Sequence, residues 1–381
     1  MFINEIYLHD SKNNITVNNI KFGRKNFFVG VSGAGKSTIL NGIITLVNIA
    51  KGGSSPADTW NIKFTDNTGR LIEWSGRFSK KNEISEDKKL VAELLEEKLV
   101  IDEVTVFTKK NKSFKLNDID FPIIEESKSN FYLLRNHELI KAAHASITSI
   151  IYSGSLESKS GSLTSIPIIT ASYEDEVKKL LSTERNSIKN LPSLGRMVDS
   201  KQRIIFSCKY DRDTFDDFMF IYTSVFPSVR EISVKQVRNI ANTSSSTDNK
   251  GYVIQLKMDD GTLVEQGAIS SGMFKTMTIL ADIIMSSDDS VILMDEIENS
   301  LGINCLQEVL NELILSDKQI IITTHHPKII NKAPIKSWKI VSRSGGVITA
   351  HEADSIKSTG NHHDPFFQLI NSDIYKNGNQ K

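Results

Sequence analysis

A phosphate-binding loop is the feature that most restricts what this chain can fold into. Residues 30–38 read Gly-Val-Ser-Gly-Ala-Gly-Lys-Ser-Thr and match the pattern G-x-x-x-x-G-K-[ST]. An apolar run at 27–29 precedes the loop and a helical pattern follows from about Lys36, which is the context that the motif requires. Glycines let backbone N–H groups surround a phosphate, and the helix adds its positive end. The chain is therefore predicted to be an α/β protein with a nucleoside triphosphate site.

The side chains of this loop have separate expected roles. Lys36 should reach the β and γ phosphates, and Ser37 should offer a hydroxyl ligand to Mg²⁺. Thr38 is expected to pack behind Ser37 as the helix begins. A Gly-rich turn with a chance lysine is the alternative, and the flanking strand and helix patterns argue against it.

A pair of acidic residues follows the apolar run Val-Ile-Leu-Met at 291–294. This pattern is typical of a Walker B strand, a buried parallel strand that carries acids at its carboxyl end. Asp295 would hold Mg²⁺ through its water shell, and Glu296 would orient and deprotonate the water that attacks the γ-phosphate. Such a pair is common by itself, but downstream of a complete phosphate loop it predicts the second half of an ATPase site.

Small polar residues open an amphipathic helix shortly before this strand. The segment Ile-Ser-Ser-Gly-Met at 269–273 is followed by apolar residues at helical spacing. Hydroxyls and free N–H groups at a helix start can bind an anion, so Ser270, Ser271 and Gly272 are predicted to form a second phosphate site. An ordinary helix cap is the simpler alternative.

Histidines stand out in two segments. The run 319–324 is expected to form another buried strand, with His325 at its carboxyl end as a γ-phosphate sensor. A histidine that only caps the strand is the alternative, and His326 is expected at the surface. His-His-Asp at 362–364 suggests a metal site, but the sequence contains no further ligand cluster to complete it.

The pattern of apolar residues divides the chain into three parts. These are an N-terminal ATPase lobe at 1–78, a mostly helical insertion or lid at 79–227 and a C-terminal ATPase lobe at 228–381. A turn at 66–69 between two alternating runs predicts an antiparallel subsheet in the first lobe. The expected strands are 2–8, 15–22, 26–30, 60–65, 71–77, 229–237 and 252–258. The expected helices include 86–97 and 138–152. We expect a connector at 153–165 and a mobile loop at 239–250.

Composition restricts the partners and the compartment. Lys plus Arg equals Asp plus Glu at 46 each, so no global positive field recruits nucleic acid, although a local patch is compatible with this balance. Cys208 and Cys305 lie far apart without metal-type spacing, as expected of a reduced intracellular protein. Neither a signal peptide pattern nor an apolar stretch of membrane-spanning length is present. The protein is therefore expected in the cytoplasm, without a membrane partner.

Taken in order, the phosphate loop, Ser-Ser-Gly, Asp-Glu and Thr-Thr-His resemble the ABC-type ATPase heads of the SMC/RecF-like and OLD-like ATPases. More narrowly, the strings GVSGAGKST, ISSGMFKT, DEIENSLG and TTHHP are similar to the ATPase subunits of bacterial anti-phage systems, such as the Septu and retron-associated ones. The resemblance covers both ends of the chain. It implies an ABC-type head with a mixed central sheet and an antiparallel β-subsheet.

The resemblance also implies a homodimer or higher homo-oligomer in which two copies enclose two ATP molecules and Mg²⁺. Ser271 and Gly272 of one copy would contact the γ-phosphate held by Lys36 of the other, and ATP would join the copies. Ser300 in the string DEIENSLG matches the D-loop, which passes between the two sites. The residues implied to contact nucleotide are Gly30, Ser32, Gly33, Ala34, Gly35, Lys36, Ser37, Thr38, Ser270, Ser271, Gly272 and Ser300.

One departure from the family concerns a glutamine. These ATPases usually place one between their lobes as a ligand to Mg²⁺ and water, whereas residues 51–200 contain none. Either Glu125 or Glu126 substitutes for it, or the position is lost. Loss would leave hydrolysis slow or dependent on a partner.

By family analogy, the favoured function is an ATPase switch that controls a separate effector, a nuclease in anti-phage defence. The residues after His326 are too few for a nuclease domain, so the effector is expected on another polypeptide.

Three alternatives remain open at this point. A RecF-like repair or recombination ATPase would bind duplex DNA, and lysines at 109–115 form a local basic cluster for it, although a solvated turn also explains them. An ABC transporter ATPase subunit is disfavoured because such subunits are shorter and keep the interlobe glutamine. A GTPase is disfavoured because the sequence has no Asn-Lys-x-Asp guanine motif.

Overall fold

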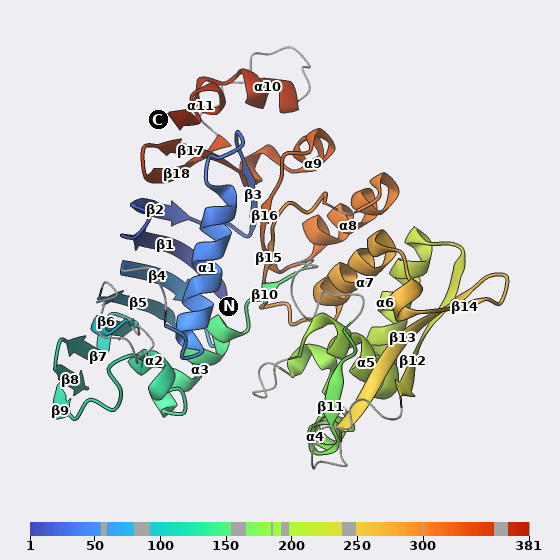
Figure 1. Ribbon diagram of the computed structural model, residues 1–381, viewed down its shortest axis with the longest axis horizontal. Coiled ribbons are helices and arrows are strands. Elements are labelled where there is room, and N and C mark those ends of the chain that lie inside the picture. Colours follow the sequence, from blue (N-terminus) through green and yellow to red (C-terminus); the bar gives the residue numbers. More distant parts are fainter. Residues whose placement is uncertain are drawn as a thin grey trace, which may run out of the picture. The chain divides into compact units, whose positions relative to one another are not determined.

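The computed structural model describes residues 1–54, 59–79, 92–153, 165–183, 186–191, 198–237, 249–299, 301–353 and 365–380. The chain forms two compact units, and each is built from segments that are distant in sequence (Figure 1). Unit 1 comprises Met1–Ile150, Asp289–Glu296 and Gln319–Lys381. Unit 2 comprises Ile151–Asp288 and Ile297–Lys318.

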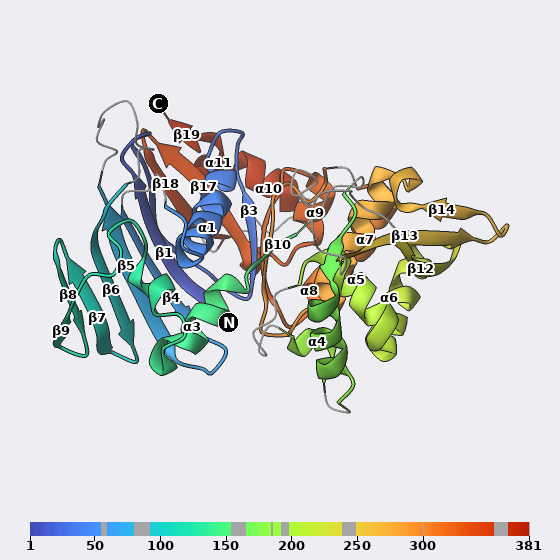
Figure 2. The ribbon, with the colours of Figure 1, turned by 60° about the horizontal axis from the view of Figure 1, so that its bottom comes forward.

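Unit 1 contains a large mixed sheet, and α1 lies against one face of it in both ribbon views (Figures 1 and 2). Its strands are β1 (Phe2–Asp10), β2 (Ile15–Lys21), β3 (Lys25–Val29), β4 (Thr59–Thr65), β5 (Leu71–Phe78), β6 (Leu94–Ile101), β7 (Val104–Lys110), β8 (Ser113–Leu116), β9 (Ile119–Phe121), β15 (Val291–Met294), β16 (Gln319–Thr323), β17 (Trp338–Ser344), β18 (Val347–Glu352) and β19 (Asn379–Gln380). Its helices are α1 (Lys36–Ala50), α2 (Asn130–Leu133), α3 (Glu138–Thr148), α9 (Pro327–Lys332), α10 (Pro365–Asn371) and α11 (Asp373–Lys376).

The sheet of unit 1 has a parallel part and an antiparallel part. Neighbouring strands run parallel in the order β15-β16-β3-β17. After β18, the order continues β2-β1-β4-β5-β6-β7-β8-β9, and these successive pairs are antiparallel. Strands β15 and β16 are buried throughout, as expected when helices or other chain segments cover both faces, whereas β4 alternates between buried and half-buried residues.

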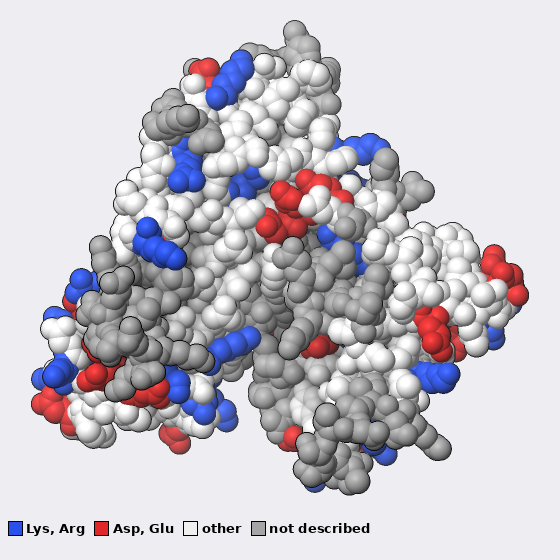
Figure 3. Space-filling view, in the orientation of Figure 1, with Lys and Arg blue, Asp and Glu red and all other residues white. Residues whose placement is uncertain are grey.

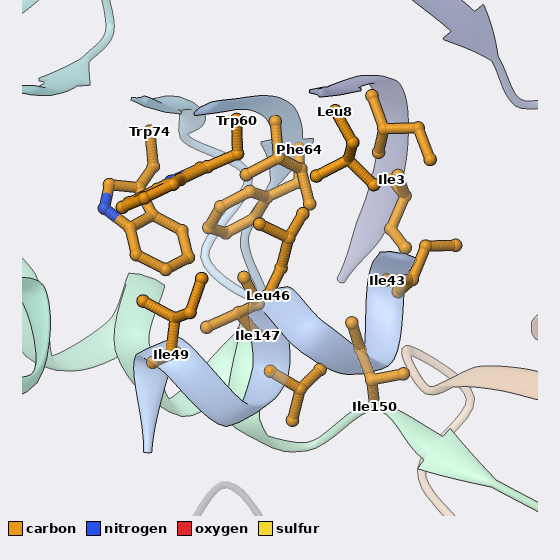
Figure 4. Close-up of a cluster of buried hydrophobic side chains, with 14 of the residues drawn as sticks. Ile3, Leu8, Ile43, Leu46, Ile49, Trp60, Phe64, Trp74, Ile147 and Ile150 are labelled. Atoms are coloured by element: carbon orange, nitrogen blue, oxygen red, sulfur yellow. The ribbon is translucent and has the colours of Figure 1, made fainter. Parts of the chain in front are cut away.

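A hydrophobic core between α1 and the antiparallel strands stabilises unit 1 (Figure 4). Leu46 and Ile49 of α1 lie among Trp60, Phe64 and Trp74, and none of these side chains is more than 1% exposed. The two tryptophan rings pack edge to face with centroids 5.4 Å apart. Burial of each such side chain is worth roughly 1.5–3 kcal/mol. The core therefore fixes α1 on the sheet and gives the loop that precedes α1 a defined position.

Unit 2 combines helices with a small antiparallel sheet in the order β11-β13-β12, with β14 paired to β13. Its strands are β10 (Ile151–Tyr152), β11 (Ile168–Thr170), β12 (Val229–Val237), β13 (Asn249–Met258) and β14 (Leu263–Glu265). Its helices are α4 (Ala171–Leu181), α5 (Ser200–Tyr210), α6 (Arg212–Val225), α7 (Ser271–Ile284) and α8 (Ile303–Leu315).

Buried polar contacts join the elements of unit 2. Arg203 of α5 donates to the Asp282 carboxylate of α7, and the two side chains are 4% and 0% exposed. Ser200 Oγ donates to the same carboxylate at 2.9 Å. Glu174 of α4 forms a second cluster, in which its carboxylate accepts from Lys209, Lys250, Tyr210 and Tyr252. These contacts connect α5 with α7, and α4 with α5 and β13.

Most elements predicted from the sequence are confirmed. The phosphate loop lies between β3 and α1, the turn at 66–69 joins β4 and β5, and the predicted strand at 229–237 is β12. Residues 154–164 and 238–248, which make up most of the predicted connector and mobile loop, lie outside the described residues. The boundaries proposed at residues 78 and 227 stay predictions.

Two helix predictions are wrong at their ends. Residues 94–97 belong to β6 and pair with β5, although a helix was predicted over 86–97. Pairing on the sheet outweighs the helical propensity of Leu, Glu and Lys there. The helix predicted at 138–152 ends at Thr148, and β10 begins at Ile151, where β-branched residues favour an extended backbone. Strands β6–β9 thus occupy the first part of the segment expected to be mostly helical, and the helices follow them.

Candidate nucleotide-binding site

Three parallel strands of unit 1 end at the same edge of its sheet. β3 leads into the phosphate loop, β15 leads into Asp295 and Glu296, and β16 ends at Thr323. β16 lies between the other two strands and runs parallel to both. Because the carboxyl ends of parallel strands meet at one edge, the topology brings the phosphate loop and the acidic pair together.

The backbone of the phosphate loop requires glycine at two positions. Gly35, the residue before α1, has a φ of 101°, which is in the left-handed region. A Cβ on Gly35 would also lie 2.4 Å from Ile348 Cδ1. A Cβ on Gly30 would lie 2.6 Å from the carbonyl oxygen of Val341. The loop can therefore lie this close to β17 and β18 only without side chains at these two positions.

Lys36 places its ammonium group against the loop itself. The residue is 5% exposed, and Nζ donates to the carbonyl oxygens of Gly30 at 3.0 Å and Val31 at 3.1 Å. Ser32 and Gly33 at the tip of the loop are exposed, whereas Ala34 is buried. A buried cation next to an exposed loop backbone suits an anionic ligand such as a phosphate chain.

Ser37 and Asp295 meet as the magnesium prediction requires. Ser37 Oγ donates to Asp295 Oδ1 at 3.0 Å. Hydroxyl and carboxylate oxygens are the ligand types that Mg²⁺ prefers, so these two side chains fit the ion. Thr38, the next residue of α1, is half-buried. Within the described part of the chain, no group of three or more His, Cys, Asp or Glu side chains could hold a metal ion, and residues 362–364 lie outside that part.

Thr323 is a site residue to which the sequence analysis gave no role. It is fully buried, and its Oγ1 donates to Asp295 Oδ1 at 2.5 Å and accepts from the Glu296 backbone N–H at 2.8 Å. Glu296 needs such a support because its φ is 43°, a left-handed backbone that costs a non-glycine residue about 1–3 kcal/mol. One hydroxyl therefore holds both acidic residues. The signal for it was a threonine at the end of the strand adjacent to the Walker B strand.

The two histidines after β16 differ in their surroundings. His325 follows Thr323 and Thr324 at the same sheet edge and is exposed. His326 is the N-cap of α9, where its Nδ1 accepts from the Lys328 N–H at 3.2 Å. His326 therefore has a structural role in starting a helix. The sensor role of His325 stays a prediction.

The Ser-Ser-Gly segment lies in unit 2, at the start of α7. Ser270 is the N-cap, and its Oγ accepts from the Met273 N–H at 3.3 Å. Ser271 is exposed and Gly272 is half-buried. The cap that we considered as an alternative is thus present, and it leaves the Ser271 hydroxyl at the surface. Ser300, the predicted D-loop residue, lies outside the described residues.

The role of Glu125 or Glu126 as a substitute for the missing glutamine stays a prediction. Glu125 pairs with Lys128 at 3.0 Å in the segment that leads to α2. Tyr132 of α2 lies against Gly52, which follows the C-terminal end of α1. The phosphate loop precedes the N-terminal end of α1, and a helix of this length spans roughly 22 Å. Tyr132 therefore lies near the end of α1 that is opposite the phosphate loop.

The lysine cluster at 109–115 is only partly a surface feature. Lys110, Lys112 and Lys115 are exposed on the β7–β8 hairpin, but Lys109 is 1% exposed. Lys115 also pairs with Asp120 at 3.9 Å. On the face that Figure 3 presents, Lys and Arg side chains over β6–β9 are interspersed with Asp and Glu. This part of the surface is of mixed charge.

The arrangement of the parts within unit 1 defines a class of protein. A mixed α/β sheet carries a phosphate loop between β3 and α1, and an acidic strand end contacts Ser37 from the same edge. This is the fold and site of a P-loop ATPase. A family model described as "AAA domain, putative AbiEii toxin, Type IV TA system" matches residues 25–331. The chain belongs to this family of AAA-type P-loop ATPases.

Solved structures with a similar fold are SMC head domains. A Smc head with an extended coiled coil bound to the C-terminal domain of ScpA, from Pyrococcus furiosus, has 15% identity and a TM-score of 0.47, over 93% of this chain and 97% of that chain. A SmcHead bound to the C-winged helix domain of ScpA has 15% identity and a TM-score of 0.44, over 92% of this chain and 97% of that chain. The SMC head domain from Thermotoga maritima has 13% identity and a TM-score of 0.41, over 92% of this chain and 99% of that chain.

No curated protein matches the chain. In the described parts of the chain, none of the helices combines the length and the apolar character needed to cross a membrane.

Proposed function

We propose that the chain binds ATP with Mg²⁺ at the phosphate loop and hydrolyses it. The observation that carries this proposal is the contact of Ser37 Oγ with Asp295 Oδ1 at 3.0 Å, since it joins the two halves of an ATPase site. Ser37 and Asp295 would hold Mg²⁺, which offsets phosphate charge when bound. Lys36 would exchange its contacts with the Gly30 and Val31 carbonyls for contacts with the β and γ phosphates.

Glu296 is the proposed general base of the hydrolysis. Its carboxylate would accept the proton of the water that attacks the γ-phosphate, and its backbone is held by the Thr323 hydroxyl. His325, at the same sheet edge, is the proposed γ-phosphate sensor. If neither Glu125 nor Glu126 replaces the missing interlobe glutamine, hydrolysis should be slow or should depend on a group supplied by a second polypeptide.

Two copies are proposed to close around ATP. Ser271 and Gly272 of one copy would contact the γ-phosphate bound by the other, and Ser300 would pass between the two sites. The exposed Ser271 hydroxyl at the start of α7 supports this arrangement, because a helix start with a free hydroxyl is suited to an anion. ATP bound only by the closed dimer would stabilise that dimer by mass action.

Two substitutions test the ATPase. Lys36→Ala should abolish nucleotide binding, because it removes the cation of the loop. Glu296→Gln should keep ATP binding, lower hydrolysis by at least about 100-fold and accumulate the ATP-bound dimer. Lys21→Ala and Glu308→Gln are matched controls, since both side chains are exposed outside the site. Unchanged ATP affinity in Lys36→Ala, or wild-type hydrolysis in Glu296→Gln, would refute the assigned roles.

We further propose that the ATP state controls a separate effector, a nuclease, in defence against phages. The similarity of the four motifs to Septu and retron-associated ATPase subunits supports this role. Purification of Glu296→Gln with ATP from its native cell, followed by mass spectrometry, tests it. A stoichiometric nuclease supports the proposal, and its absence from the closed dimer contradicts it.

A DNA repair or recombination ATPase is equally compatible with the family and the site. Exposed lysines on the β7–β8 hairpin favour it, although the charge around them is mixed. Duplex DNA should then stimulate ATP hydrolysis with a steep salt dependence. Hydrolysis that does not respond to DNA at low salt would exclude this function.

A further inference from the structure

The first turn of α7 is held in place by contacts that the proposed function has not used. Tyr222 OH of α6 donates to the Met273 carbonyl oxygen at 3.3 Å. Thr276 Oγ1 donates to the Gly272 carbonyl oxygen at 2.8 Å. With the Ser270 cap, these contacts give the turn that presents Ser271 a fixed backbone within unit 2.

Lys275 extends from this turn to a second functional segment. It follows Ser271 by four positions, so the two side chains lie on one side of α7, one turn apart. Lys275 is 4% exposed, and its Nζ donates to the backbone carbonyl oxygen of Asn299. Asn299 precedes Ser300, and the Leu301 N–H donates to the Glu298 carbonyl oxygen at 3.3 Å. The lysine therefore connects the start of α7 with the segment that directly precedes the D-loop position.

We infer that Lys275 is a positioning residue that holds segment 297–299 at a fixed distance from the Ser271 turn. The inference deepens the proposed function and rests on it, because Ser271 and the D-loop are assigned there to the nucleotide of the second copy. Removing a lysine from water is costly, so a buried ammonium that bonds a carbonyl in one defined segment is a specific contact. An ionised donor also makes the stronger kind of hydrogen bond.

Such a link has a kinetic consequence. The segment of Asn299 follows the proposed base Glu296 directly in sequence and leads into Ser300. A displacement of about 1 Å in catalytic positioning can cost about 100-fold in rate. Loss of the Lys275 contact should therefore lower kcat, whereas ATP binding by the phosphate loop of unit 1 should not change.

The test compares Lys275→Met with Lys275→Arg and with a matched control. Lys201→Met is that control, because Lys201 is also a buried lysine of unit 2, 1% exposed, and it donates to a backbone carbonyl, that of Ser165, at 2.7 Å. Three quantities are measured on the full chain: the Kd for ATP, kcat and KM for hydrolysis, and hydrogen exchange of the peptide covering 297–301.

Lys275→Met should lower kcat about tenfold or more, leave the Kd for ATP within about twofold and accelerate exchange in 297–301. Lys275→Arg should restore at least half of the kcat, because it keeps a cationic donor. The inference is overturned if Lys275→Met has the kcat and exchange of the wild type, or if Lys201→Met reproduces both changes. If Lys275→Met does not fold, Lys275→Gln, which keeps a donor of shorter reach, decides by the same measurements.

The same measurements distinguish a failure of the proposed function from a failure of the role of Lys275. If the wild-type protein neither hydrolyses ATP nor dimerises as Glu296→Gln, the proposed function falls, and the exchange of 297–301 still decides whether Lys275 holds the segment. If Glu296→Gln dimerises with ATP but Lys275→Met behaves as the wild type, the function stands and the role of Lys275 falls.

Discussion

Thr323→Val tests whether one hydroxyl holds both acidic residues of the site. Valine keeps the shape of threonine but cannot donate to Asp295 or accept from the Glu296 N–H. A hydrogen bond to a charged group is worth about 1.5–3 kcal/mol, and an unsatisfied buried N–H costs about 1–3 kcal/mol. Asp295 retains its contact with Ser37, so the two losses do not add fully. We expect a stability loss of about 2–4 kcal/mol.

The effect on catalysis follows from the backbone of Glu296. Its left-handed φ of 43° is unfavourable without the Thr323 contact, so its carboxylate should move away from the position of the attacking water. We expect kcat to fall about 10- to 100-fold and the Mg²⁺ concentration for half-maximal rate to rise.

Thr324→Val is the matched control for this substitution. Thr324 is also fully buried, and Thr324→Val also removes one hydroxyl, which accepts from the His326 N–H at 3.0 Å. Steady-state hydrolysis over a Mg²⁺ titration, together with urea unfolding, separates the two variants. Our reasoning is refuted if Thr323→Val and Thr324→Val have the same kcat and the same Mg²⁺ dependence.

Three further predictions concern the loop and the buried charges. Gly35→Ala should destabilise the protein and weaken ATP binding, because the new Cβ would lie 2.4 Å from Ile348. Gly69 has a similar φ but no atom within 4 Å of the added Cβ, so Gly69→Ala should cost only about 1–3 kcal/mol in thermal unfolding. Equal losses of stability in the two variants would contradict this prediction. Asp282→Asn should cost about 3–5 kcal/mol in urea unfolding, because it leaves the Arg203 charge buried without its carboxylate partner. Asp216 forms an exposed pair with Arg212, so Asp216→Asn should cost less than about 1 kcal/mol. Comparable losses in the two variants would contradict the stabilising role of the buried pair. Burial alone would raise the pKa of Glu174, but hydrogen bonds from Lys209, Lys250, Tyr210 and Tyr252 lower that pKa to about 2, below its value in the unfolded chain. The ionised Glu174 carboxylate therefore stabilises the folded protein by about 2–3 kcal/mol above about pH 5, and this contribution is lost towards pH 2. Glu174→Gln should flatten the curve of unfolding free energy against pH in that window. An unchanged slope would refute the lowered pKa of Glu174.

The sequence predicted the parts of the fold that local patterns determine. The phosphate loop required a strand before it and a helix after it, and β3 and α1 are in those positions. Four apolar residues before Asp295 are typical of a parallel strand that is buried on both faces, and β15 does pair parallel with β16. Alternation and a turn signal also predicted the β4–β5 hairpin.

The errors arise where distant pairing decides the structure. Leu94-Leu95-Glu96-Glu97 has the composition of a helix, yet β5 and β7 pair with it on both sides, and Glu97 accepts from Trp74 Nε1 at 2.9 Å in the interior. No local pattern reports these neighbours.

The contacts of Thr323 and Lys275 show what a functional site needs besides its sequence motifs. Each is a polar side chain beside a recognisable motif, so the sequence contained the right residue types. Their roles depend on which strand is adjacent to β15 and on which carbonyl the lysine reaches, and only tertiary packing sets these. Because a buried donor must find a partner, each such contact restrains the backbone of a neighbouring catalytic segment. The motifs thus identify the chemistry, whereas buried polar neighbours one strand or one helical turn away determine whether the reacting groups are held in place.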